Sequence, residues 1–133
     1  MRCVLVVEDD PWIQWMIADD LRDRGFDVLT ARDGLEALRC VARIHPDAIV
    51  LDLVLPRMSG WEFLRRARVA GTPSPILVIT GEHDQALPAA IPPIERYLRK
   101  PFDIEELARN VAELVARQPL DAAAPVAARA KVS

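Results

Sequence analysis

The most informative part of the sequence is IVLDLVLPRMSGWEF, which runs from Ile49 to Phe63. Its first half is a near-continuous apolar run, typical of a strand that is buried on both faces of a parallel sheet. Pro56 and Gly60 then mark a turn. Asp52 is the exception inside the apolar run, because a buried carboxylate is costly unless it is paired, hydrogen-bonded or bound to a cation. This acid therefore needs a chemical reason.

The length and composition describe one globular domain. The chain has 133 residues, 51% of them hydrophobic and 28% charged, with a net charge of −3. These values are ordinary for a single folded domain, and a negative charge gives no attraction to nucleic acid or an anionic membrane. No apolar run reaches the ~20 residues that span a bilayer. Cys3 and Cys40 lack the spacing of a metal or disulfide motif, so we expect reduced core thiols and a cytoplasmic protein.

Apolar runs alternate with helical patterns along the chain. Short apolar or β-branched runs predict strands at Val4–Val7, Asp27–Ala31, Ala48–Leu53 and Ile76–Thr80. A poorly patterned stretch then leads to a fifth strand near Arg96–Arg99. Apolar residues at helical spacing predict helices at Pro11–Arg24, Leu35–Ile44, Gly60–Val69 and Asp103–Arg117. This alternation predicts an α/β fold, in which a doubly wound five-stranded parallel sheet carries helices on both faces through right-handed crossovers.

The end of the chain differs from the rest. After Gln118 the sequence reads PLDAAAPVAARAKVS, which is rich in Ala and Pro and has almost nothing to bury. Such a composition is typical of a disordered segment. We therefore expect one domain over residues 1–117 and a disordered tail over residues 118–133.

Polar side chains gather where the predicted strands end. Open parallel sheets bind ligands outside the carboxyl ends of their strands, and for the strand order 2-1-3-4-5 the site lies between strands one and three. Strand one ends in an acidic run, strand three in an acid, and hydroxyl and ammonium groups follow strands four and five. The residues at this edge are Glu8, Asp9, Asp10, Asp52, Thr80 and Lys100.

Several carboxylates at one edge need a cation. Two carboxylates ~5 Å apart repel by roughly 3 kcal/mol at an effective dielectric constant of ~20. Mg²⁺ suits such a site, because it takes carboxylate oxygens together with water and phosphate oxygens. An acidic magnesium site beside a lysine is typical of phosphoryl transfer. Asp52, on the central strand, is the best placed carboxylate to accept a phosphoryl group covalently.

In order and spacing, Glu8-Asp9, Asp52, Thr80 and Lys100-Pro101-Phe102 resemble the receiver domain of two-component response regulators. DLVLPRMSGWEF and YLRKPF are the most specific matches, and the resemblance extends from about Arg2 to Arg117. It implies a flavodoxin-like fold with strand order 2-1-3-4-5. It also implies a stand-alone phosphorelay switch that takes one phosphoryl group per chain and is not an enzyme with a separate substrate.

The resemblance assigns a role to each site residue. It makes Asp52 the phosphoacceptor, and it places Mg²⁺ between Glu8, Asp9, Asp52 and the backbone carbonyl of Val54. Lys100 would pair with the phosphoryl group, Thr80 would swing to bond it, and Tyr97 would be the aromatic switch that follows. The Lys100–Pro101 bond would be cis.

The resemblance also implies a partner. The phosphoryl donor would be a sensor histidine kinase or a histidine phosphotransfer protein, and such kinases dock on the first helix. Trp12 and Trp15 lie on the polar side of that helix, off the apolar stripe that contains Ile13 and Met16. The docking residues would be Trp12, Ile13 and Met16. A tryptophan half-buried at the helix edge is an equal alternative to a docking role. The downstream target is unknown.

Other interpretations compete with these roles. Asp10 precedes Pro11, so capping of the first helix is favoured over metal binding. Thr80 fits an ordinary strand position and Tyr97 a core aromatic. At the level of the whole chain, the alternatives are a Mg²⁺-dependent aspartyl phosphatase, which as a family has a second Asp where Val54 stands, and a degenerate receiver that only binds proteins. A dinucleotide-binding domain would need a glycine-rich turn where EDDP stands.

The segment before the fifth strand departs from the family pattern. Residues 81–97 read GEHDQALPAAIPPIERY, with prolines at 88, 92 and 93. Proline in a helix interior costs ~3 kcal/mol, so we expect at most a short, irregular fourth helix here. In relatives this helix contributes to the face that dimerises on phosphorylation. We therefore expect a monomer.

Overall fold

The computed structural model describes residues 2–81 and 94–117. Its elements, in chain order, are β1 (Cys3–Val7), α1 (Pro11–Asp23), β2 (Asp27–Ala31), α2 (Gly34–Arg43), β3 (Ala48–Asp52), α3 (Gly60–Val69), β4 (Ile76–Thr80), β5 (Arg96–Arg99) and α4 (Ile104–Ala116). The five strands form one parallel sheet in the order β2-β1-β3-β4-β5. The predicted fold and strand order are confirmed, and every helix and strand lies within two residues of its predicted limits.

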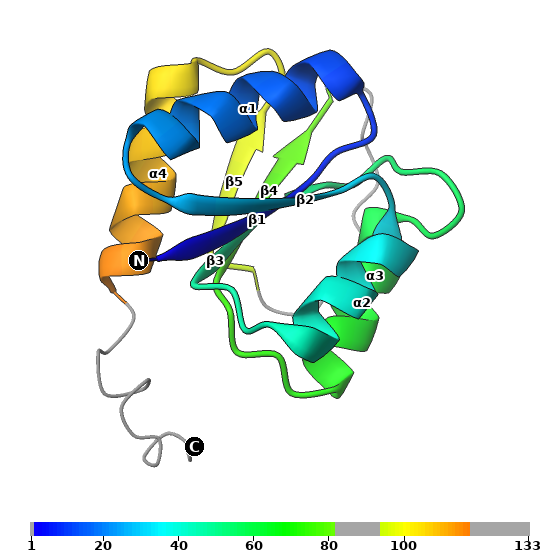
Figure 1. Ribbon diagram of the computed structural model, residues 1–133. Coiled ribbons are helices and arrows are strands. Elements are labelled where there is room, and N and C mark those ends of the chain that lie inside the picture. The colour runs from blue at the N-terminus through cyan, green and yellow to red at the C-terminus, as the bar shows by residue number, and fades with distance from the viewer. Residues whose placement is uncertain (1, 82–93, 118–133) are drawn as a thin grey trace.

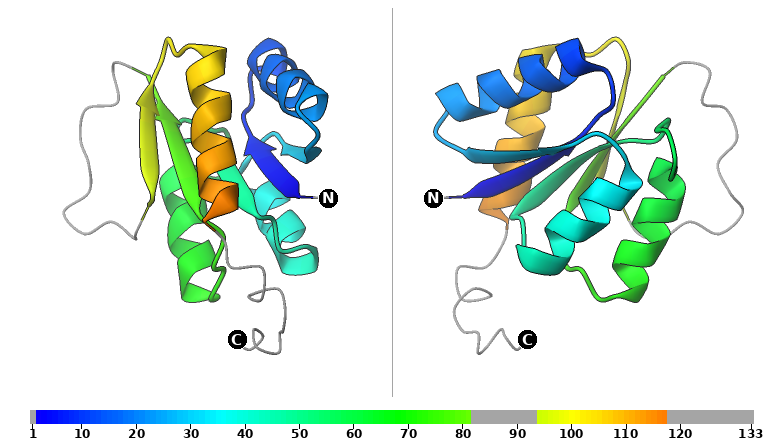
Figure 2. Two further views of the ribbon diagram at one scale, coloured as in Figure 1. Left: turned by 90° about the vertical axis from the view of Figure 1, so that its left-hand side faces the viewer. Right: turned by 45° about the vertical axis from the view of Figure 1, so that its right-hand side comes forward.

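Helices cover both faces of the sheet (Figure 1). α1 and α4 lie together on one face, and α2 and α3 lie side by side on the other (Figure 2). Alternate residues of β1 serve the two layers, because Val4 and Val6 pack under α1 and α4 whereas Leu5 and Val7 pack under α2 and α3. A strand between two apolar layers has no polar face, which explains the continuous apolar runs in the sequence.

The junction between β3 and α3 is tightly closed. Ser59 caps α3 by accepting a hydrogen bond from Glu62 N, and Gly60 N donates to the carbonyl of Leu53 at 2.9 Å. A Cβ atom added at Gly60 would lie 2.5 Å from the backbone oxygen of Asp52, so only glycine fits this close approach. The turn that the sequence placed here therefore starts α3 directly behind Asp52.

Several narrower expectations can also be compared with the structure. The Lys100–Pro101 bond is cis, as predicted. Cys3 and Cys40 are free thiols, as expected, but both are only partly buried and are not the fully buried core residues that the sequence predicted. None of the helices in the described ranges is long and apolar enough to cross a membrane. The predicted irregular fourth helix and the predicted tail over residues 118–133 lie outside the described residues.

Candidate functional site

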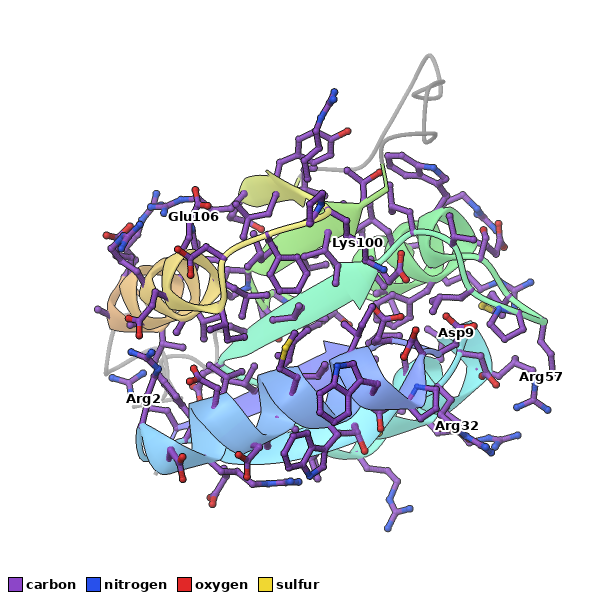
Figure 3. All side chains as sticks on the ribbon, turned by 90° about the horizontal axis from the view of Figure 1, so that it is seen from above. Arg2, Asp9, Arg32, Arg57, Lys100 and Glu106 are labelled. Carbon is purple, nitrogen blue, oxygen red and sulfur yellow. The ribbon has the colours of Figure 1, made fainter. Side chains whose placement is uncertain are left out.

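The sheet register brings the predicted site residues to one edge. Val7 of β1 pairs with Leu51 of β3, so the residues that follow them, Glu8 and Asp52, are neighbours. On the other side of β3 lies β4, which pairs with β5. Just past the end of β5, Lys100 N donates to the carbonyl of Thr80 at 2.6 Å. Figure 3 shows Lys100 and Asp9 at this carboxyl end of the strands. Residues from four strand ends thus converge as the sequence predicted.

Three carboxylates form a compact cluster at this edge. Across the described residues there is one group of acids able to hold a metal ion, in which oxygens of Glu8, Asp9 and Asp52 lie within 4.8 Å of one another. Glu8 is 1% and Asp52 3% exposed, whereas Asp9 faces solvent. Asp52 accepts a hydrogen bond from Val54 N at 3.1 Å, which holds its carboxylate against the following loop.

Lys100 lies between the two buried acids. Its Nζ is 3.1 Å from Asp52 Oδ2, to which it donates, and 3.2 Å from Glu8 Oε1. Burial disfavours the charged ammonium, but the hydrogen bond to Asp52 and the charges of both carboxylates outweigh it, so the pKa of Lys100 is raised. The lysine stays charged and offsets part of the repulsion between the acids.

The electrostatics of Glu8 indicate room for a second cation. Burial, followed by the charge of Asp52, raises the pKa of Glu8 to about 7. Within residues 2–81 and 94–117, Glu8 Oε1 is the one fully buried side-chain oxygen that makes no hydrogen bond, although the Lys100 ammonium is close by. Its other oxygen accepts from Asp10 N at 3.1 Å. A buried oxygen without a hydrogen bond, beside two more carboxylates, fits a hard divalent cation such as Mg²⁺.

The cluster opens into a pocket, which we call the acidic pocket. Its volume is about 570 Å³, and its lining residues are Glu8, Asp9, Asp10, Pro11, Ile13, Asp52, Val54, Gly81 and Lys100. The lining includes Val54, whose carbonyl would be a metal ligand according to the resemblance.

Comparison with known proteins agrees with this geometry. The family model of the response regulator receiver domain matches residues 4–112. The chain belongs to the response regulator receiver family.

Relatives of known name support the assignment. Response regulator MprA of Mycobacterium leprae (strain TN) is 41% identical over 130 residues, which cover 93% of this chain and 56% of the relative. Response regulator MprA of Mycobacterium tuberculosis (strain ATCC 25618 / H37Rv) is 39% identical over 132 residues, covering 95% and 56%. The chain therefore spans about half the length of the curated relatives it matches.

Solved receiver structures share the fold. The receiver domain of Francisella response regulator 1452 superposes with a TM-score of 0.77 at 28% identity, covering 88% of this chain and 98% of that one. Response regulator TrrA of Thermotoga maritima, solved in complex with Mg²⁺-BeF, gives a TM-score of 0.73 at 30% identity and covers 86% and 99%.

Asp10 of this receiver has a structural role. Its Oδ1 accepts hydrogen bonds from Trp12 N at 2.9 Å and from Ile13 N at 3.1 Å, so it caps α1 as the sequence favoured. Asp10 borders the acidic pocket but lies outside the three-carboxylate cluster. Of these three consecutive acids, Glu8 and Asp9 belong to the carboxylate cluster and Asp10 caps the helix.

The two predicted switch residues lie in different environments. Thr80 is 2% exposed at the end of β4, and its hydroxyl donates to the carbonyl of Gly81 at 3.3 Å. Tyr97 on β5 is 45% exposed, so it is not the core aromatic of the alternative interpretation. Thr80 directly precedes Gly81, which lines the acidic pocket, whereas Tyr97 lies outside that lining.

The exposed aromatic residues of α1 form a pair. Trp12 is 66% and Trp15 53% exposed, and their rings stack with centroids 5.3 Å apart. Trp15 therefore fits the half-buried alternative, whereas Trp12 is mostly exposed. Ile13 and Met16 are partly buried beside them, and Ile13 also lines the acidic pocket.

Sequence reasoning missed Gln14. Its Nε2 donates to the carbonyl of Glu8 at 2.9 Å and to the carbonyl of Ala31 at 3.2 Å, so it joins α1 to the ends of β1 and β2. The side chain holds the backbone that carries the acidic run. A single glutamine in a helix belongs to no motif, and its partners are carbonyls that every residue has, so the sequence carried no signal for it.

Proposed function

We propose that this receiver accepts a phosphoryl group on Asp52 from the phosphohistidine of a sensor histidine kinase or a histidine phosphotransfer protein. The phosphorus–nitrogen bond would break as a phosphorus–oxygen bond to the Asp52 carboxylate forms. The observation that carries the proposal is the position of Asp52, a buried acid at the end of the central strand beside a lysine and two further acids. An ordinary core strand has no use for this arrangement.

Glu8, Asp9, Asp52 and the carbonyl of Val54 would hold Mg²⁺. A divalent cation bound there would neutralise charge on the phosphoryl oxygens. The similar receiver TrrA was solved with Mg²⁺-BeF, which supports a magnesium site in this chain. The Lys100 ammonium, already 3.1 Å from Asp52, would pair with the incoming anionic group as a point charge.

Signalling would follow from residues around the acid. Thr80 would turn its hydroxyl from the carbonyl of Gly81 towards the phosphoryl group, and Tyr97 would change its exposure in response. Trp12, Ile13 and Met16 would dock the kinase, since the stacked indoles are exposed immediately beside the pocket through which its histidine must enter. Large exposed aromatics are the side chains that dominate binding energy at interfaces.

The proposal extends to the state of the protein. We propose that residues 1–117 form the functional domain with residues 118–133 as a tail, and that it acts as a stand-alone monomer without direct nucleic-acid contact. Free thiols at Cys3 and Cys40 suit a reducing compartment such as the cytoplasm. The chain spans 56% of the length of the MprA relatives. Stand-alone action and signalling to a downstream partner are therefore proposals.

Mass spectrometry tests the central step. Incubation with a small phosphodonor and Mg²⁺ should add one phosphoryl group per chain, and Asp52→Asn should abolish the addition while the circular dichroism spectrum stays the same. Excess chelator should also prevent it. Labelling that persists in Asp52→Asn or in chelator would rule the assignment out.

A further inference from the structure

The loop between β3 and α3, residues 53–59, connects the proposed phosphoacceptor to the next helix. It carries Val54, which lines the acidic pocket and whose N–H donates to Asp52. Within it, Arg57 has a φ of 63°, in the left-handed region that is unfavourable for a residue with a side chain. A backbone conformation of this kind persists when the surroundings impose it.

An ion pair holds the side chain of Arg57. The Arg57 guanidinium donates to Asp33 Oδ2 through Nε at 2.9 Å and also through Nη2. Asp33 is buried at the start of α2, where its other oxygen, Oδ1, accepts from Glu36 N at 2.9 Å. The backbone hydrogen bond from Glu36 and then the guanidinium outweigh burial and lower the pKa of Asp33. A buried charge held from both sides makes a rigid anchor for the loop.

A second contact lies next to the ion pair. Gly34 N donates to the carbonyl of Met58 at 3.3 Å, and a Cβ atom at Gly34 would lie 2.8 Å from that oxygen. Two consecutive residues at the start of α2 therefore contact two consecutive residues of the loop. Asp33 pairs with Arg57, and Gly34 N donates to the carbonyl of Met58. Figure 3 shows Arg57 on the same side of the molecule as Asp9.

We propose that the Arg57–Asp33 pair is a positioning device that holds the loop in the conformation presenting Val54 to the acidic pocket, and so sets the affinity for Mg²⁺. Arg57 is absent from the pocket lining, so it acts through the loop and touches neither metal nor phosphoryl group. The inference rests on the proposed magnesium site. Residues that orient metal ligands from a distance commonly change metal affinity when they are replaced.

Isothermal titration with Mg²⁺ tests the proposal at a temperature where every variant is folded. Arg57→Ala and Asp33→Asn should each raise the Mg²⁺ dissociation constant about tenfold, the lower limit for partners that support a metal ligand. Asn can still cap α2, so Asp33→Asn removes only the charge. The double variant should bind no more weakly than either single variant, because both remove the same pair.

Two further variants separate the explanations. Arg57→Gly relieves the left-handed backbone but removes the ion pair, so it should bind Mg²⁺ as weakly as Arg57→Ala. Arg66→Ala removes an exposed ion pair with Glu62 on α3, away from the loop, and should bind like the wild type. Hydrogen exchange should rise at the amides of Val54 and Met58 in Arg57→Ala and in Arg57→Gly, and should stay at the wild-type level in Arg66→Ala.

The outcomes are distinct. Wild-type affinity in Arg57→Ala and Arg57→Gly would overturn the inference and leave the proposed function intact. Absence of Mg²⁺ binding in the wild type would overturn the proposed function and the inference with it. If Asp33→Asn does not fold, the two Arg57 variants decide the question.

Discussion

Glu8 is the residue whose state depends most on what else occupies the site. It is almost fully buried, its pKa is raised to about 7, and one of its oxygens makes no hydrogen bond. In the unfolded chain the same group titrates near 4.5. Between these two pH values the folded protein therefore holds a proton on Glu8 that the unfolded chain releases.

The sign of the resulting pH dependence follows directly. In chelator, the contribution of Glu8 to stability is most favourable below pH 4.5 and is lost as the pH rises towards 7, on the order of 3 kcal/mol in total. Urea unfolding of the wild type and of Glu8→Gln should show the difference between them changing over this range. Mg²⁺ added at pH 7 should restore stability to the wild type. A difference that is constant with pH would contradict the assignment.

The individual site residues were predictable to different degrees. Asp52 was found because a charge inside an apolar strand is unusual, and Lys100 because it follows the fifth predicted strand at the same edge of the sheet. Asp10 was assigned to capping because Pro11 follows it, and the structure agrees. The pairing of Arg57 with Asp33 was not predictable, because the chain has 17 basic and 20 acidic residues and a partner 24 positions away carries no local signal.

At the scale of elements, α1 combines a fixed start with an exposed aromatic surface. Asp10 holds its first turn, Gln14 ties it to the ends of β1 and β2, and the stacked Trp12 and Trp15 face solvent. Trp12 is mostly exposed, and about half of Trp15 faces solvent. Truncating one of them should therefore change binding more than folding.

Trp12→Ala should slow phosphoryl transfer from a phosphorylated sensor kinase about tenfold, the loss expected for one interface anchor of ~1.4 kcal/mol. Uptake from a small phosphodonor should be unchanged, since the carboxylates and Lys100 are untouched. Val69→Ala is a matched control, because Val69 is 79% exposed on α3. Both variants should unfold within ~0.5 kcal/mol of the wild type. Kinase transfer at the wild-type rate in Trp12→Ala would remove docking as its role.

The limits of the elements followed from capping residues and glycines. Asp10, Ser59 and Asp103 precede α1, α3 and α4 and accept hydrogen bonds from their first turns. The start of α2 was placed one residue late, because Asp33-Gly34 is equally typical of a turn. The requirement for glycine at position 34 comes from Met58, a tertiary contact that no sequence pattern reports.

At the scale of the whole molecule, helices cover both faces of the sheet, and the carboxylate cluster lies at the carboxyl ends of its strands. The fold could be predicted because strands that alternate with helical patterns admit few topologies. The association state is a separate matter, since the predicted departure from the family lies in residues 82–93, outside the described structure.

Light scattering tests the prediction that the protein is a monomer. We expect the monomer mass with Mg²⁺ alone and with Mg²⁺ and beryllium fluoride, because the three prolines at positions 88, 92 and 93 predict at most a short, irregular helix before β5. Asp52→Asn with the same additives is the control. A dimer that forms only in wild-type protein with beryllium fluoride would refute the prediction.

The stacked indoles of α1 have an optical consequence. Two aromatic chromophores held 5.3 Å apart, with an angle of 23° between their planes, couple their electronic transitions. The far-ultraviolet circular dichroism spectrum should then contain a paired positive and negative band that disappears when either Trp12 or Trp15 is replaced by phenylalanine. Because α1 also lines the acidic pocket through Ile13, the protein carries its own spectroscopic reporter, and partners that bind to α1 can be followed in unlabelled material.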